Sequence, residues 1–166
     1  MTATEQIDIK DLTRICAALY IGNILAALSQ FSVYISAFGM AAVLCITVYA
    51  YIKRAELKGT LFETHFHWMI RSFWIGGAVY LPILTVLGTA YFLSNADLTK
   101  MADAAWEGEK NRLYLMSLMY ESNADLMNRM MLVSTAFFSA WWAWRMLRGL
   151  FFLRKQQPVA SVNSWL

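Results

Sequence analysis

Long apolar runs interrupted by short polar stretches dominate the hydropathy pattern of this chain. A helix that crosses a bilayer needs about 20 mostly apolar residues. Four segments meet this requirement, at about 12–29, 33–52, 68–93 and 130–150. Hydrocarbon offers no hydrogen-bond partners to the backbone, and a helix satisfies its backbone N–H and C=O groups internally. We therefore predict an all-α integral membrane protein in which residues 1–166 form a single domain with four transmembrane helices.

The stretches between these runs predict how the helices are connected. Only residues 30–32 separate the first two spans, which predicts a tight hairpin. Pro82 lies midway along the third span and predicts a kink there. Around the start of that span, an apolar stripe at helical spacing is formed by Phe62, Phe66, Met69 or Ile70, and Phe73. This spacing predicts an amphipathic elbow that lies partly among the lipid headgroups and then turns into the membrane.

The segment 94–128, between the third and fourth spans, is too long for a simple turn. Within it, Leu113, Met116, Met119 and Tyr120 share one helical stripe, which is typical of an amphipathic helix on a membrane surface. The pentapeptide SNADL occurs at 94–98 and again at 122–126. Because Ser, Asn and Asp favour helix N-termini, we expect both copies to start helices rather than to form a duplicated binding unit.

Composition strengthens the membrane assignment. The chain is 59% hydrophobic and only 15% charged, whereas soluble domains contain roughly 25% charged residues. Too few polar groups are present to cover a water-soluble globule of 166 residues. The net charge of +3 is modest and gives no support for nucleic-acid binding.

Lysines and arginines predict the orientation of the four spans. Ten of the 14 lie on the side that holds both termini, and four lie on the side of the segment 94–128. Cytoplasmic loops carry an excess of Lys and Arg. We therefore predict a multi-pass protein of the bacterial inner membrane, with both termini cytoplasmic and a periplasmic amphipathic helical segment at 94–128.

The stretch THFHWMIRSFW at 64–74 holds both histidines of the chain, His65 and His67. Side chains two positions apart on a helix point about 200° away from each other, so these two could not bind one metal ion together. A haem held by two histidines would need ligands from two helices, and the chain has no third histidine. We therefore predict no metal site, no cofactor and no catalytic residues.

Two interpretations of this stretch remain open. In the first, it is only the elbow, with its tryptophans at the level of the lipid headgroups. In the second, a docking site for lipid headgroups or a partner protein forms at the inner ends of the third and fourth spans. The residues of this predicted docking site are His65, His67, Trp68, Arg71, Trp74, Arg145 and Arg148. In the fourth span, Trp141, Trp142 and Trp144 predict an aromatic collar that anchors the helix in the membrane.

The region around the two histidines resembles a signature of small, uncharacterised bacterial inner-membrane proteins. The signature consists of a basic pair, then Gly-Thr, then HFxWxIRxFW. Its residues here are Tyr51, Lys53, Arg54, Gly59, Thr60, Glu63, His65, Phe66, Trp68, Ile70, Arg71, Phe73 and Trp74. The terminal NSWL at 163–166 is similar to the tails of the same proteins.

That group distantly resembles the protein-import component of the chloroplast inner envelope, whose members are four-helix proteins with a comparable elbow. The resemblance implies a four-helix fold and a role as a subunit of a larger membrane assembly, and it does not establish protein translocation. The chain departs from the group at Met69, where a polar residue is expected, and in the greater length of the segment 94–128. The longer segment predicts an added element that binds a partner.

Three functions follow from these features. We expect a non-enzymatic accessory or scaffold subunit that contacts membrane lipids and either another membrane protein or further copies of itself. The first alternative is a component of a channel or transporter, which would have to oligomerise because four spans are few for a pore. The second is an enzyme that acts on lipid or quinone through His65, His67, Glu63 and Arg71, although no nucleophile or metal set accompanies them.

Overall fold

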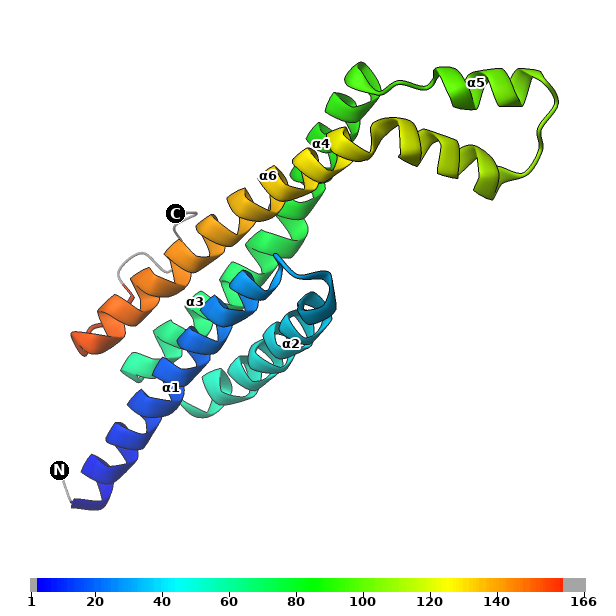
Figure 1. The fold of residues 1–166 in the computed structure, drawn as a ribbon. Helices are drawn as coiled ribbons and strands as arrows, with labels where there is room; N and C mark the ends of the chain where they lie inside the picture. The colour runs from blue at the N-terminus through cyan, green and yellow to red at the C-terminus, as the bar shows by residue number, and fades with distance from the viewer. Residues whose placement is uncertain (1–2, 160–166) are drawn as a thin grey trace. The chain divides into compact units, whose positions relative to one another are not determined.

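The computed structural model describes residues 3–159, and these residues form helices with no β-strand among them (Figure 1). The predicted all-α class is confirmed. Within this part of the chain, three helices are long and apolar enough to cross a membrane: Ile9–Ser29, Tyr34–Glu56 and Leu61–Asn95. The fourth predicted span lies inside α6 (Arg112–Arg154) and is helical throughout. Since α6 is not among the three helices, a fourth crossing remains a prediction.

The chain divides into two compact units. The described residues of the first unit are 3–80 and 136–159, and those of the second are Leu81–Thr135. Four elements lie wholly in the first unit: α1 (Ala3–Ser29), α2 (Val33–Glu56), α3 (Leu61–Ile75) and the π-helical turn η1 (Gly76–Tyr80). Two helices lie wholly in the second: α4 (Leu81–Asn95) and α5 (Thr99–Trp106). Both units contain part of α6, and a single domain over residues 1–166 remains a prediction.

The first two helices form a hairpin, as predicted from the short stretch between them. α1 ends at Ser29, α2 begins at Val33, and residues 30–32 form the turn. The two backbones come close because Gly39 has no side chain: a Cβ atom there would lie 3.1 Å from the carbonyl oxygen of Ala26. Small residues allow this close approach between helices in membrane proteins.

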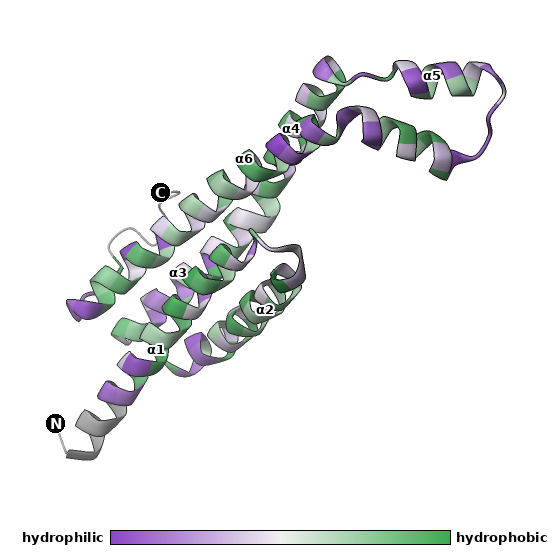
Figure 2. Cartoon of the chain, viewed as in Figure 1, coloured by the Kyte–Doolittle hydropathy of each residue, from purple (hydrophilic) through white to green (hydrophobic). Residues whose placement is uncertain are grey.

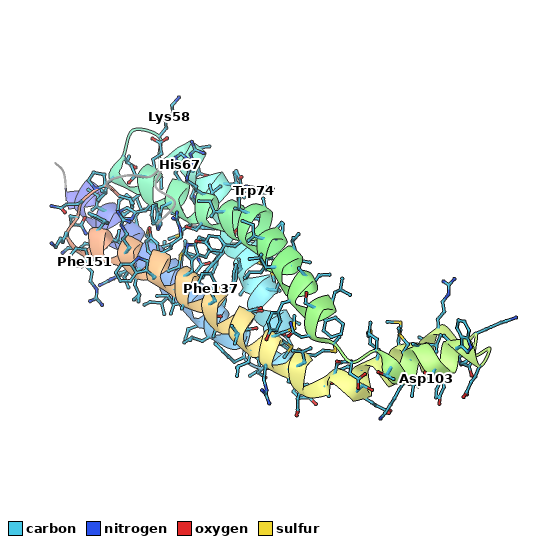
Figure 3. The ribbon with its side chains drawn as sticks, turned by 90° about the horizontal axis from the view of Figure 1, so that it is seen from above. Lys58, His67, Trp74, Asp103, Phe137 and Phe151 are labelled. Carbon is cyan, nitrogen blue, oxygen red and sulfur yellow. The ribbon has the colours of Figure 1, made fainter. Side chains whose placement is uncertain are left out.

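A second tight turn joins α2 to α3. Gly59 has φ of 81°, a left-handed conformation that glycine adopts without strain. Its backbone N–H donates a hydrogen bond to Oε2 of Glu63 over 2.8 Å, and Thr60 is the N-cap residue of α3. Lys58, in the same turn, extends away from the helices (Figure 3). Gly59, Thr60 and Glu63 of the signature therefore have a structural explanation, since they set where α3 begins.

The third candidate span changes helix type near its middle. α3 ends at Ile75, η1 covers Gly76–Tyr80, and α4 begins at Leu81. Pro82 has no N–H, and its ring clashes with the carbonyl four residues earlier in a regular α-helix. A π-turn is one of the local changes that accompany such an interruption. A π-helical turn therefore lies just before Pro82, and the kink predicted there remains a prediction.

Only the first of the two SNADL copies is followed directly by the start of a helix. The first copy spans the end of α4 and the loop before α5, which begins at Thr99. The second copy lies inside α6, so the predicted helix start at Ser122 is wrong. Asn111 provides the N-terminal cap instead, because its Oδ1 accepts a hydrogen bond from the backbone N–H of Leu113 over 3.1 Å. An uninterrupted helix after this cap leaves no terminus for Ser122 to cap.

Apolar side chains cover much of the helix exterior. Figure 2 shows α1 and α2 as largely hydrophobic, whereas the loop between α5 and α6 is largely hydrophilic. On α2, Tyr34 is 89% exposed, and only 11% of the most apolar stretch of Leu61–Asn95 is buried. Exposing such surface to water costs about 25 cal/mol per Å². Lipid removes that cost, so these helices indicate a membrane protein.

The packing of α6 on α1 depends on Gly149. A Cβ atom at this position would lie 2.4 Å from Cε1 of Tyr20, whose side chain is fully buried. We expect Gly149→Ala to lower the free energy of unfolding by about 1–3 kcal/mol, because the ring has no free space to enter. Gly77→Ala is the control, since its Cβ would meet no atom within 4 Å. Thermal unfolding in one detergent measures both, and unchanged stability of the Gly149 variant would contradict this packing.

Candidate functional site

The end of α6 turns the C-terminal chain back toward α3. Gln156 has φ of 53°, and its N–H donates to the carbonyl oxygen of Leu153 over 2.9 Å. The N–H of Gln157 donates to the carbonyl oxygen of Phe152 over 3.0 Å. These two bonds form a Schellman motif, with glutamine at the position that glycine usually occupies. Pro158 follows, so the helix cannot continue.

His65 joins this C-terminal chain to two helices. The side chain is fully buried, with Nδ1 3.0 Å from the hydroxyl oxygen of Tyr20 in α1 and Nε2 3.1 Å from the carbonyl oxygen of Gln157. Because a carbonyl oxygen only accepts, Nε2 carries a proton, and burial disfavours a second proton on the ring, so Nδ1 accepts the hydroxyl proton of Tyr20. His65 is therefore a neutral connector between α1, α3 and the C-terminal chain. Nearby, the N–H of Val159 donates to Oγ1 of Thr64 over 3.2 Å.

Arg145 of α6 and Trp68 of α3 contact each other at two points. Both side chains are fully buried. The guanidinium carbon Cζ lies 3.9 Å from the centroid of the indole ring, and the indole Nε1–H donates to the backbone carbonyl oxygen of Arg145 over 2.9 Å. A desolvated cation–π contact contributes about 2 kcal/mol. The pair therefore fixes α6 against α3 through both a side chain and the backbone.

Ser72 extends this contact into a short hydrogen-bond chain. Nε of Arg145 donates to Oγ of Ser72 over 3.0 Å, and that hydroxyl donates to the carbonyl oxygen of Trp68 over 2.7 Å. A buried charge is costly unless it is hydrogen-bonded, and successive hydrogen bonds polarise one another. These hydrogen bonds explain how an apolar helix bundle accommodates the buried Arg145.

The predicted aromatic collar of the fourth span is only partly at the surface. Trp144 is exposed, whereas Trp141 and Trp142 are buried. The ring of Trp141 packs on Tyr80, with 4.1 Å between the centroids. Trp142 occupies the space that a side chain at Gly76 would need, since a Cβ there would lie 2.9 Å from its ring. These two tryptophans therefore pack α6 against η1 instead of facing the lipid headgroups.

The seven residues of the predicted docking site fall into two groups. The buried side chains, which contact the protein interior, are His65, Trp68 and Arg145. The partly or largely exposed side chains are His67, Arg71, Trp74 and Arg148. Figure 3 labels two of them, His67 and Trp74. The exposed Trp74 is held in place because its Nε1–H donates to the hydroxyl oxygen of Tyr51 in α2 over 2.6 Å. Docking through the accessible group remains a prediction.

The buried residues His65 and Arg145 and their hydrogen-bond partners form what we call the polar core of the first unit. Each ring nitrogen of His65 is engaged in a hydrogen bond, so the ring has no lone pair left for a metal ion or a substrate proton. His67 lies on a different, partly exposed side of α3, as expected for positions two apart on a helix. Among residues 3–159, no group of three His, Cys, Asp or Glu side chains is placed to hold a metal ion.

Sequence reasoning missed three members of the polar core, Tyr20, Ser72 and Gln157, and also the neighbouring Thr64. Ser72 carried a usable signal, because it lies one helical turn after Trp68 and therefore on the same face. Tyr20 and Gln157 carried none, since they lie 45 and 92 residues from His65. Only the packing of the helices brings them together.

The bond between Tyr20 and His65 can be tested by substitution. We expect Tyr20→Phe to lower the free energy of unfolding by about 1–3 kcal/mol, because Nδ1 of His65 would stay buried without a donor. In a His65→Ala background the same change should cost less, with a coupling energy of about 0.5–3 kcal/mol. Thermal unfolding of the two single variants and the double variant measures the coupling. Additive effects of the two substitutions would show that the bond does not form.

Comparison of the chain with protein-family models, with curated proteins and with solved structures gave no match. Membership in the group of bacterial inner-membrane proteins therefore remains a prediction from the signature. The signature residues, from Tyr51 to Trp74, all lie in the described first unit, and the terminal NSWL at 163–166 lies outside the described residues.

Proposed function

We propose that the protein is a non-enzymatic accessory or scaffold subunit of a larger assembly in the bacterial inner membrane. One observation carries this proposal: a stripe of exposed apolar side chains lies in α6, outside the three candidate spans. Met119 of the predicted stripe is only partly exposed. The other three residues, Leu113, Met116 and Tyr120, are 78%, 59% and 52% exposed. We call these residues the α6 stripe. On α5, Trp106 is 93% exposed.

We infer that a protein partner buries the exposed side chains of the α6 stripe. The residues follow Asn95, where the last of the three candidate spans ends, so a membrane crossing does not account for their exposure. Large contiguous apolar patches are uncommon on monomeric soluble proteins and mark sites that contact a protein or a membrane. Aromatic residues and methionine are enriched at protein interfaces, and methionine adapts its shape to a partner.

The proposal includes a fourth crossing by residues 130–150 of α6. With four crossings, ten of the 14 lysines and arginines lie on the side of the termini, which is the cytoplasmic side by the usual charge bias. The segment 94–128 is then periplasmic. The α6 stripe would meet the periplasmic face of a partner in the same membrane.

The contacts made by residues of the signature support a role as a scaffold. Trp74 bonds to Tyr51 of α2, His65 bonds to Tyr20 of α1, and Trp68 bonds to Arg145 of α6. These residues hold helices together, and in the family that the signature resembles they would serve the same purpose. A motif that fixes a fold suits a subunit whose task is to present surfaces.

An oligomeric channel or transporter is the second candidate. The π-helical turn Gly76–Tyr80 interrupts a candidate membrane span, and such turns are frequent at functional sites. This candidate requires several copies of the chain around one pore. Ion flux through the reconstituted protein would favour it over the accessory subunit.

Photocrosslinking tests the α6 stripe. A benzoylphenylalanine in place of Leu113 or Met116 should crosslink to one discrete protein in native membranes, because the partner covers these side chains. Glu121 is the matched control position, since it is exposed on the same helix but lies off the stripe. The double variant Leu113→Glu, Met116→Glu should lose the partner on purification while keeping its thermal stability.

Two results would refute the accessory role. The first is crosslinking of the stripe only to lipid, which would place this helix on the membrane surface. The second is equal crosslinking from Glu121 and from the stripe, which would show that the contact is not specific.

A further inference from the structure

A groove in the second unit lies between α4 and α6 and has a volume of about 670 Å³. Its apolar part is lined by Leu84, Leu87, Tyr91 and Val133. Its polar part is lined by Asn95, Asp97, Asp125 and Arg129. A volume of several hundred Å³ is typical of a small-molecule or cofactor site. The groove thus offers apolar walls at one end and charges at the other.

The two copies of SNADL build the polar end. Asn123 of the second copy is buried, and its amide forms two hydrogen bonds with the backbone of Asp97 in the first copy. Its Oδ1 accepts from the N–H of Asp97 over 2.7 Å, and its Nδ2 donates to the carbonyl oxygen of Asp97 over 2.7 Å. This paired bond fixes the loop after α4 on α6 and places Asp97 in the wall of the groove.

Three charged side chains define what the polar end can bind. Asp125 and Arg129 are four residues apart, so they share one face of α6. The backbone N–H of Thr99 donates to Oδ1 of Asp97 over 3.0 Å. Hydrogen bonds from the side chain and the backbone of Thr99 lower the pKa of Asp97, so this carboxylate is ionised at neutral pH. A ligand with one positive and one negative group matches these charges.

The apolar part continues into a candidate membrane span. Leu84, Leu87 and Tyr91 belong to α4, within the span Leu61–Asn95. The charged residues Asp97, Asp125 and Arg129 lie outside that span. From the apolar part to the polar part, the groove therefore follows the order of a phospholipid, with acyl chain first and charged headgroup last. A soluble zwitterion would leave the apolar walls uncovered.

We propose that this groove binds a phospholipid whose headgroup carries a primary ammonium, as in phosphatidylethanolamine. The phosphate pairs with Arg129, the ammonium donates to Asp97 and Asp125, and an acyl chain covers the apolar walls. A choline headgroup has no N–H to donate, and an anionic glycerol headgroup brings no positive charge to the carboxylates. The site is separate from the α6 stripe, so it goes beyond the proposed accessory role.

Native mass spectrometry of the full-length protein in detergent tests this assignment. Phosphatidylethanolamine should bind about tenfold more tightly than phosphatidylcholine or phosphatidylglycerol, since only its ammonium forms charge-assisted hydrogen bonds with the carboxylates. Gly88→Leu should abolish the preference, because the new side chain would enter the groove that Gly88 lines. Ala90→Leu is the matched control, since Ala90 is exposed on α4 but is not among the lining residues.

Charge variants separate the contributions to headgroup binding. Asp97→Asn with Asp125→Asn should remove the preference for phosphatidylethanolamine and leave phosphatidylcholine binding unchanged. Arg129→Gln should weaken the binding of every phospholipid. Thermal unfolding checks that each variant remains folded.

Three outcomes would overturn the proposal. One is equal binding of the three lipids, and another is an unchanged lipid preference in the Gly88→Leu protein. The third is tight binding of glycerophosphoethanolamine, which has no acyl chains and would identify a site for a soluble zwitterion. None of these outcomes bears on the crosslinking of the α6 stripe, so the two proposals can fail separately.

Discussion

Polar groups in the first unit must satisfy one another, because the outer surfaces of its helices are apolar. Buried Arg145 rests on Trp68 and bonds to Ser72, and His65 bonds to Tyr20 and Gln157. In lipid, no water could replace these partners, and an unpaired polar group would cost several kcal/mol. The positions of α1, α3, α6 and the C-terminal chain therefore depend on this polar core.

The secondary structure was largely predictable, because long apolar runs and short polar breaks are local signals. The contacts within the polar core were not predictable, because they join residues that lie far apart in the sequence and meet only when the helices pack. The pentapeptide SNADL shows the same limit. Its residues favour helix starts, but Asn111 caps α6 earlier, and Asn123 instead bonds to Asp97. Local preference was therefore overridden by a tertiary contact.

The two units differ in the features that their described residues form. In the first unit, signature residues form contacts between helices, so they contribute to the stability of the fold. The second unit has the exposed α6 stripe and a groove of mixed polarity. In the proposed roles, the α6 stripe binds a protein partner and the groove binds a phospholipid. The segment 94–128 contains the α6 stripe and several residues that line the groove, among them Asn95, Asp97, Asn123 and Asp125.

The polar core and the proposed lipid site both depend on hydrocarbon around the exposed faces of α1, α2 and α4. Cys45 tests this most directly, because it lies midway along the candidate span Tyr34–Glu56 and its side chain is exposed, whereas Cys16 is buried. In opened membrane vesicles, a water-soluble maleimide should leave Cys45 unmodified and react readily with a control cysteine placed at the exposed Lys110. Modification of Cys45 as fast as that control would mean that water, and not lipid, covers this face.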